Sequence, residues 1–177
     1  MTSIVRALAD FPADADIEKD ATIRGEHVEY RYDLTRIWDR SLPICVFTML
    51  NPSTADGKTD DATIRKCERF AFLWGYGGIV VVNLFAYRAT KPAVLRPLTA
   101  EVAVGPLNDD FIAAAVSDAG EVICAWGSEK FAAPRAEVVT GMLRRVCLIT
   151  PRYLRLARSG APWHPLYVPY SELPKAF

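Results

Sequence analysis

The sequence has few residues that bind metal ions. It contains two histidines, His27 and His164, and its four cysteines include no CxxC pair. Protein zinc sites are built from clusters of these residue types at short spacings, so we expect no metal site. Three of the cysteines lie inside apolar, strand-like runs, where a cysteine behaves as a small buried hydrophobe. We therefore predict neither a cofactor nor a disulfide framework.

Long apolar runs are also absent. No run reaches the roughly 18 to 20 residues that a membrane-spanning helix needs. The N-terminal segment carries acids where a signal peptide has a basic region followed by an apolar one, so we expect a cytoplasmic protein with no membrane partner. At 177 residues, 51% of them hydrophobic, the chain fits a single α/β domain over residues 21–177. Residues 1–20 are predicted to form a short helix or a loosely attached arm.

Common nucleotide-binding and hydrolase motifs are missing as well. The chain has no GxxxxGK(S/T) and no GxGxxG, which disfavours Walker-type nucleotide hydrolysis and Rossmann-type dinucleotide binding. The glycine-rich stretch at residues 75–78 precedes an apolar run instead of following one, so we interpret it as the end of a helix. No GxSxG nucleophile elbow occurs either.

The charge is balanced, with 21 basic and 21 acidic residues, but it is unevenly distributed. Residues 10–20 hold five acids and one lysine, whereas residues 138–171 hold five arginines and no acid. A basic stretch beside a site can dock phosphate groups, so we expect Arg152, Arg155 and Arg158 to contact a nucleotide or nucleic acid. The alternative is a solvated surface that is rich in arginine.

A β-hairpin is expected ahead of the main sheet. Apolar and polar side chains alternate over residues 21–38 around Gly25-Glu26, which is typical of two antiparallel strands. The alternating residues are Val28, Tyr30 and Tyr32 on one face and Glu29 and Arg31 on the other. We expect the hairpin to cover one edge of the sheet.

The rest of the chain alternates short apolar runs with amphipathic segments, the pattern of a βαβ protein. The apolar runs predict strands at residues 44–49, 79–82, 121–125 and 146–149. Helical spacing predicts helices from about residue 60 to 74, from 106 to 117 and from 131 to 143. We predict a three-layer α/β/α fold with a central, four-stranded, mainly parallel sheet plus the N-terminal hairpin.

Polar or aromatic residues follow each predicted strand. Asn51 follows the first strand, Asn83 ends the second, and Trp126-Gly127 follows the third, while the fourth leads towards His164. In open α/β sheets, ligands bind outside the carboxyl ends of the strands. We therefore expect these residues to share one site at that edge of the sheet.

These residues offer a narrow range of chemistry. An asparagine amide donates and accepts together, so it can read the edge of a base. His164 can stabilise a developing anion or act as an acid or base near neutral pH. Asp56, close to the first of the asparagines, can orient a water molecule. Phe85, Tyr87 or Trp126 can stack on a planar ring.

Structural alternatives stay open for several of these residues. Asn51 can bond its own backbone in an Asn-Pro turn, and His164-Pro165 can be a structural turn. Asp56, Asp60 and Asp61 can all cap backbone amides, and for Asp60 and Asp61 we favour that role.

Several stretches form a set of motifs that extends over nearly the whole chain after residue 20. They are Leu50-Asn51-Pro52-Ser53-Thr54-Ala55-Asp56, Asp61-x-Thr63-Ile64-Arg65, Trp74-Gly75-Tyr76-Gly77, Asn83-Leu84-Phe85-Ala86-Tyr87-Arg88-Ala89-Thr90, Ala125-Trp126-Gly127 and His164-Pro165-Leu166-Tyr167. Together they resemble the bacterial and phage family catalogued as domain of unknown function 1643. That name implies no activity.

The order of the motifs also resembles the uracil-DNA glycosylase superfamily. Its mismatch-specific branch has Gly-Ile-Asn-Pro-Gly where this chain has Met49-Leu50-Asn51-Pro52-Ser53, and its thermostable branch has a Thr-Asn-x-x-x-x-Arg stretch similar to residues 83–88. The resemblance implies the central fold predicted above. It also implies that Asn51, beside Pro52 and Ser53 at the substrate, positions the attacking water. Asn83 would read the flipped base, and His164 would stabilise the leaving base.

We therefore predict a hydrolase that cleaves the N-glycosidic bond of a base or modified base in nucleic acid or a nucleotide. Arg88, together with the three later arginines, is expected to hold phosphates. One alternative is a non-catalytic module that binds a nucleotide or nucleic acid in the same pocket, with saturable binding and no base release. The other is a small-molecule hydrolase with no salt-dependent DNA binding. The sequence does not indicate the oligomeric state.

Overall fold

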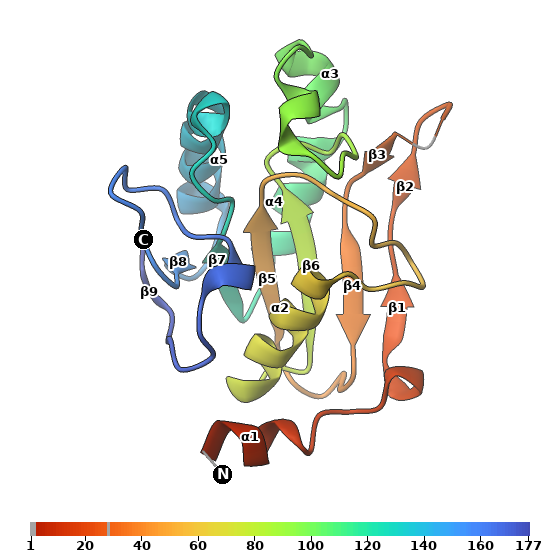
Figure 1. Cartoon of the computed structure of the whole chain (residues 1–177), viewed down its shortest axis with the longest axis vertical. Coiled ribbons are helices and arrows are strands. Elements are labelled where there is room, and N and C mark those ends of the chain that lie inside the picture. The colour runs from red at the N-terminus through yellow and green to blue at the C-terminus, as the bar shows by residue number, and fades with distance from the viewer. Residues whose placement is uncertain (1–2, 28) are drawn as a thin grey trace.

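The structure, a computed structural model, describes residues 3–27 and 29–177 and is built around one mixed β-sheet (Figure 1). The order of its strands is β1 (Glu18–Asp20), β4 (Leu34–Ile37), β6 (Gly78–Asn83), β5 (Ile44–Met49), β7 (Glu121–Cys124), β8 (Arg152–Tyr153) and β9 (Lys175–Ala176). The neighbours β6, β5, β7 and β8 run parallel to one another. β4 and β1 extend one side of this group and β9 the other, each through antiparallel pairing.

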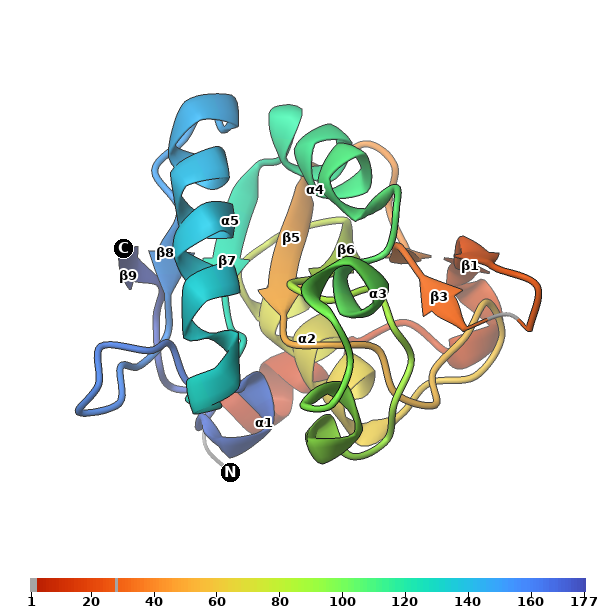
Figure 2. The same cartoon turned by 90° about the horizontal axis from the view of Figure 1, so that it is seen from above.

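Helices cover both faces of the sheet (Figures 1 and 2). One face packs against α2 (Ala62–Leu73), and the other packs against α4 (Asn108–Ser117) and α5 (Ala133–Val146). The shorter helical segments are α1 (Ser3–Leu8), α3 (Ala100–Val104) and the 3-10 turns Asp14–Asp16, Pro92–Leu95, Lys130–Ala132 and Pro165–Tyr167. Within the described residues, no helix combines the length and the apolarity needed to cross a bilayer.

The unit formed by β5, α2 and β6 follows directly from the sequence. β5 is buried at all but its first residue, as expected for a parallel strand covered on both faces. Asp61 begins α2, because its carboxylate accepts hydrogen bonds from the amides of Thr63 and Ile64. The strand register sets Met49 opposite Asn83, so the carboxyl ends of β5 and β6 meet at one edge of the sheet.

The predicted strands at residues 44–49, 79–82 and 121–125 are confirmed to within a residue, as is the parallel pairing of the first two. The strand predicted at residues 146–149 is wrong. α5 continues to Val146, and Leu148 is 85% exposed, so this apolar run does not enter the sheet. The fourth parallel strand is β8, which is only two residues long, and the sheet has seven strands where the sequence predicted four.

The N-terminal β-structure is divided between two sheets. β2 (Ile23–Arg24) and β3 (Tyr30–Arg31) form the predicted antiparallel pair, whereas the following strand, β4, enters the main sheet beside β6. β1 lies within the segment predicted as an arm and pairs with β4. Val28, which the alternating pattern placed in the hairpin, lies outside the described residues.

Candidate functional site

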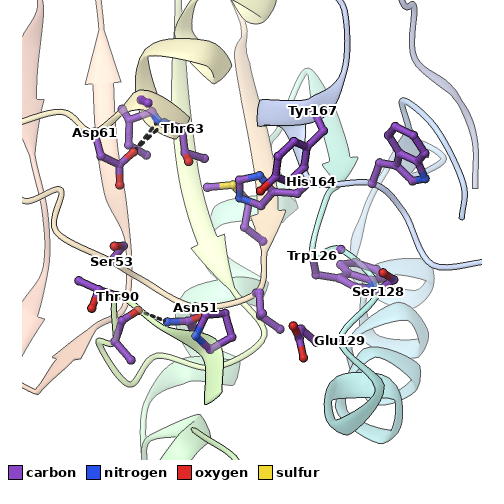
Figure 3. Close-up of a pocket in the computed structure, with 18 of the residues that line it drawn as sticks. Asn51, Ser53, Asp61, Thr63, Thr90, Trp126, Ser128, Glu129, His164 and Tyr167 are labelled. Atoms are coloured by element: carbon purple, nitrogen blue, oxygen red, sulfur yellow. Dashed lines mark hydrogen bonds between the residues drawn. The ribbon is translucent and has the colours of Figure 1, made fainter. Parts of the chain in front are cut away.

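A pocket of about 850 Å³ opens at the carboxyl ends of β5 and β7 (Figure 3). Its walls come from residues within segments 49–53, 61–64, 89–92, 126–129 and 163–167, together with Arg31. These segments are far apart in sequence and meet at the sheet edge that the strand-end rule indicated. Of the predicted site residues, the pocket lining includes Asn51, Ser53, Trp126, Gly127 and His164.

Asn51 is held in one orientation by backbone atoms. Its Nδ2 donates to the carbonyl oxygen of Ala89 at 2.7 Å (Figure 3) and to that of Pro52 at 3.0 Å, so both amide hydrogens are used. Its Oδ1 accepts no hydrogen bond from the part of the chain that the structure describes. The side chain therefore bonds its own turn, as the structural alternative proposed, and still presents an acceptor at the pocket.

His164 is positioned by its own turn and by a glycine. Its Nδ1 accepts a hydrogen bond of 3.4 Å from the amide of Leu166, an arrangement that leaves the ring proton on Nε2. A Cβ on Gly127 would lie 4.0 Å from the Cβ of His164, so the loops after β7 and before the Pro165 turn are close neighbours. Burial lowers the pKa of His164, partly offset by the charge of Asp61. The imidazole is therefore a neutral N–H donor at pH 7.

Two aspartates follow Asn51 in the sequence, Asp56 and Asp61, and they differ in their position relative to the pocket. The Oδ1 of Asp56 accepts hydrogen bonds from the amides of Lys58 and Thr59, both at 2.8 Å, and these bonds lower its pKa. Asp56 does not line the pocket, whereas Asp61 does. Asp61 is confirmed as a cap, and its second carboxylate oxygen receives no hydrogen bond from the described residues. Of these two aspartates, the one at the pocket is thus Asp61.

The aromatic residues of the pocket are Trp126, Trp163 and Tyr167. Trp126 is 4% exposed, whereas Tyr167 is 71% exposed and its ring centroid lies 5.9 Å from that of His164. Phe85 and Tyr87, predicted to stack on a ring, do not line the pocket. Phe85 stacks on Phe131 within the core, and Tyr87 packs edge-on against Tyr30.

Asn83 is at the predicted strand end, but it is fully buried and does not line the pocket. Neither its Oδ1 nor its Nδ2 has a hydrogen-bond partner among the described residues. Its backbone carbonyl accepts a bond of 3.0 Å from Asn108 Nδ2. Pro52 is also buried outside the pocket lining, where its carbonyl binds Asn51 and the amide of Ala89.

The arginines predicted to hold phosphates do not line the pocket, although Arg155 lies over the ring of the lining residue Trp163, 5.6 Å from its centroid. Arg152 pairs with Glu121 at 3.6 Å, and Arg155 pairs with Glu172 at 3.3 Å. Arg158 is exposed. Arg88 follows β6, where its backbone amide donates to the carbonyl of Glu29.

Three charged residues line the pocket without having been predicted there: Arg31, Asp61 and Glu129. Arg31 is 2% exposed, and its Nη1 donates to the carbonyl oxygen of Ala55 at 2.7 Å. Glu129 forms an ion pair of 3.1 Å with Arg96. The position of Glu129 directly after Trp126-Gly127-Ser128 was a usable signal, but nothing local distinguishes Arg31 from a solvated strand arginine. No group of three or more potential metal ligands occurs among the described residues.

Comparison with known proteins gives a family but no activity. A family model described as "Protein of unknown function (DUF1643)" matches residues 31–166, a range that includes Arg31, Asn51, Asp61 and His164. Neither the curated proteins nor the solved structures contain a match to the chain. The family predicted from the motifs is therefore confirmed. The chain belongs to the DUF1643 family of proteins of unknown function.

Proposed function

We propose that this protein hydrolyses the N-glycosidic bond of a base or modified base in a nucleotide or nucleic acid. The observation that carries this proposal is that Asn51 and His164 face one pocket, each fixed by its own backbone contacts. The motif order shared with the uracil-DNA glycosylase superfamily supports it, and we propose kinship of fold with that group.

Asn51 receives the attacking water. Because its Nδ2 is bound to two carbonyls, only Oδ1 is available, and it accepts one hydrogen from the water. The water oxygen attacks the anomeric carbon of the sugar, and its proton passes to a carboxylate. Asp61 is that carboxylate, because it lines the pocket and Asp56 does not, while the other acid of the pocket, Glu129, is paired with Arg96.

His164 assists the departing base. As the glycosidic bond breaks, its electron pair moves onto the base, and the neutral Nε2–H donates a hydrogen bond to the developing anion. The lowered pKa of His164 keeps the ring uncharged at pH 7, so this donor is present without an acid–base step. Tyr167 and Trp163 provide faces on which a planar base can stack.

The test is base release from single- and double-stranded oligonucleotides and from free nucleotides that carry uracil, mismatched or modified bases. We expect His164→Ala to lower the rate by roughly two to four orders of magnitude, through loss of electrostatic stabilisation. Asn51→Ala should abolish release. Normal turnover by either variant on a confirmed substrate would remove that residue from the mechanism.

The carboxylate assignment has its own comparison. Asp61→Asn keeps a helix cap but removes the charge, so we expect slower release from a folded protein. Asp39→Asn is the matched control, since Asp39 accepts from Ser41 in an exposed turn away from the pocket. A loss on Asp56→Asn instead of Asp61→Asn would move the role to the Asn51 loop.

A second candidate is a binding module without catalysis. It is favoured by one observation, which is that both acids of the pocket already have partners. Asp61 accepts hydrogen bonds from amides of α2, and Glu129 forms an ion pair with Arg96. This alternative predicts saturable binding of nucleotides with no release of base from any substrate of the panel.

A further inference from the structure

Arg31 is a buried cation at the pocket with no acid bound to it. Its one side-chain hydrogen bond goes from Nη1 to the carbonyl of Ala55, and its Nε is buried without a partner among the described residues. It forms no ion pair within that part of the chain, although it is 2% exposed. Buried arginines are normally paired, because removing a guanidinium from water is costly. Arg31 therefore lacks the anion that its position calls for.

The charges around Arg31 leave it cationic. The pKa of Arg31 is lowered to about 10, mainly by burial and also by the nearby Arg88 and Arg36, while Asp61 and Asp33 act in the opposite direction. A pKa of about 10 still means a protonated guanidinium at pH 7. Asp61 forms no ion pair with Arg31 in the described structure, and its Oδ1 is bound to the first-turn amides of α2.

The start of α2 also lies at the pocket. Ala62 and Thr63 line it, and the 12-residue helix directs its positive end there, although the carboxylate of Asp61 already occupies the amides of Thr63 and Ile64. Thr63 and Ser53 also offer hydroxyl groups at the pocket. A phosphate is the anion that best matches a planar guanidinium with several donors.

The burial of Arg31 restricts which phosphate can reach it. A group that contacts a side chain 2% exposed must lie inside the pocket, and an internal phosphodiester continues as a chain on both sides. A terminal phosphate monoester has no such continuation. The surface gives little support for a nucleic-acid strand, since Arg152 and Arg155 are paired with acids and the net charge is zero.

We propose that the substrate is a nucleoside monophosphate whose terminal phosphate binds Arg31 at the start of α2, an inference that rests on the proposed hydrolase function. Its base lies towards His164 and the aromatic wall, and its sugar lies between Asn51 and Asp61. Nucleic acid is then not the substrate of this pocket.

The experiment is titration calorimetry of the wild-type protein with each common nucleoside, its 5′-monophosphate, inorganic phosphate and a single-stranded oligonucleotide without terminal phosphates. We expect at least one monophosphate to bind about 10- to 100-fold more tightly than its nucleoside, which is the range for hydrogen bonds to a charged group. Inorganic phosphate alone should bind more weakly than that monophosphate. Arg31→Lys should remove most of the difference between nucleotide and nucleoside, because lysine cannot bind bidentately.

Arg40→Lys is the matched control, since Arg40 pairs with Glu18 on the surface, and it should leave the difference unchanged. Thermal melting of each variant distinguishes the loss of a contact from the loss of the fold. The comparison of nucleoside with monophosphate uses the wild-type protein and does not depend on any variant. Equal affinity for every nucleoside and its monophosphate overturns the proposal. The proposal is also overturned if the oligonucleotide binds more tightly than any monophosphate and Arg155→Ala removes that binding. It is overturned as well if no nucleotide binds at all.

Base release measured on the same ligands separates the two proposals. Arg31-dependent binding of a monophosphate, with no base release from it or from any substrate of the base-release panel, would refute the hydrolase but keep the phosphate site. Release from oligonucleotides and not from monophosphates would keep the hydrolase and refute the mononucleotide as its substrate.

Discussion

Arg31 and Arg36 lie in consecutive strands, β3 and β4, and are equally inaccessible, at 2% and 0% exposed. Their surroundings differ. The Nε of Arg36 binds Asp60 at 2.7 Å, and its other nitrogens donate to the backbone carbonyls of Asp20, Thr35, Asp56 and Thr59. Arg31 has one carbonyl partner, that of Ala55, and lines a pocket.

The difference separates two uses of a buried arginine. Both hold the loop after β5, since Arg36 binds the carbonyl of Asp56 and Arg31 that of Ala55. Arg36 completes a charge network in which Lys19 also binds Asp60, at 2.6 Å. Its bonding capacity is filled, so it stabilises the fold. The unfilled capacity of Arg31 is open to a ligand.

Replacing Arg36 should produce the largest change in stability. Arg36→Met leaves Asp60 buried with only Lys19 as partner and leaves several carbonyls without a donor. We expect the free energy of unfolding to fall by about 3 kcal/mol, as when one member of a buried pair is removed. Urea denaturation at pH 7 measures it. A loss as small as that of a surface substitution would mean that the network does not stabilise the fold.

Glu68, in α2 close to the same network, should give the next largest change. The pKa of Glu68 is raised to about 7, mainly by burial and also by Asp60, while Arg36 and Lys19 act in the opposite direction. Because the pKa of Glu68 is higher in the folded than in the unfolded state, its protonation stabilises the fold at a pH below the unfolded-state pKa. This stabilisation is lost as the pH rises through about 7. Glu68→Gln should therefore stabilise the protein by about 2 kcal/mol at pH 8 and change little at pH 4. Denaturation at both pH values checks this. A larger gain in the free energy of unfolding at pH 4 than at pH 8 would contradict the predicted pH dependence.

Replacing Arg31 should change stability least. Arg31→Met loses one hydrogen bond to Ala55 but also removes an unpaired buried charge, so we expect a net change below about 1 kcal/mol. Denaturation measured beside Arg36→Met tests the contrast directly. An equal loss for the two variants would show that Arg31, too, mainly stabilises the fold.

The strongly patterned part of the chain could be predicted from sequence. The alternation of buried strands with α2 identified β5 and β6, and the acids before the helix identified the cap at Asp61. The C-terminal part could not be predicted in the same way, because β8 and β9 have two residues each, too few for a periodicity. The apolar run after Leu143 was ambiguous for the same reason, and the structure assigns its start to α5.

The site was predictable where residues follow strand ends. Asn51 and Gly127 meet at the pocket because the parallel strands β5 and β7 bring their carboxyl ends together, whereas His164 reaches it through the loop after β8 and not from the strand predicted at residues 146–149. Arg31 was not predictable. Strand alternation separates the two faces of the hairpin, but it does not show which face is buried. The partner of Arg31 is the carbonyl of Ala55, which belongs to a loop later in the chain.

The pocket also has an order of assembly. The chain emerges from the ribosome N-terminus first, and Asn51, Asp61 and Trp126 are all made before the turn that carries His164. During the intervening seconds of synthesis, the nascent protein has one wall of its site but lacks the other. A ligand that bridges both walls can therefore bind only after the turn that carries His164 has been made.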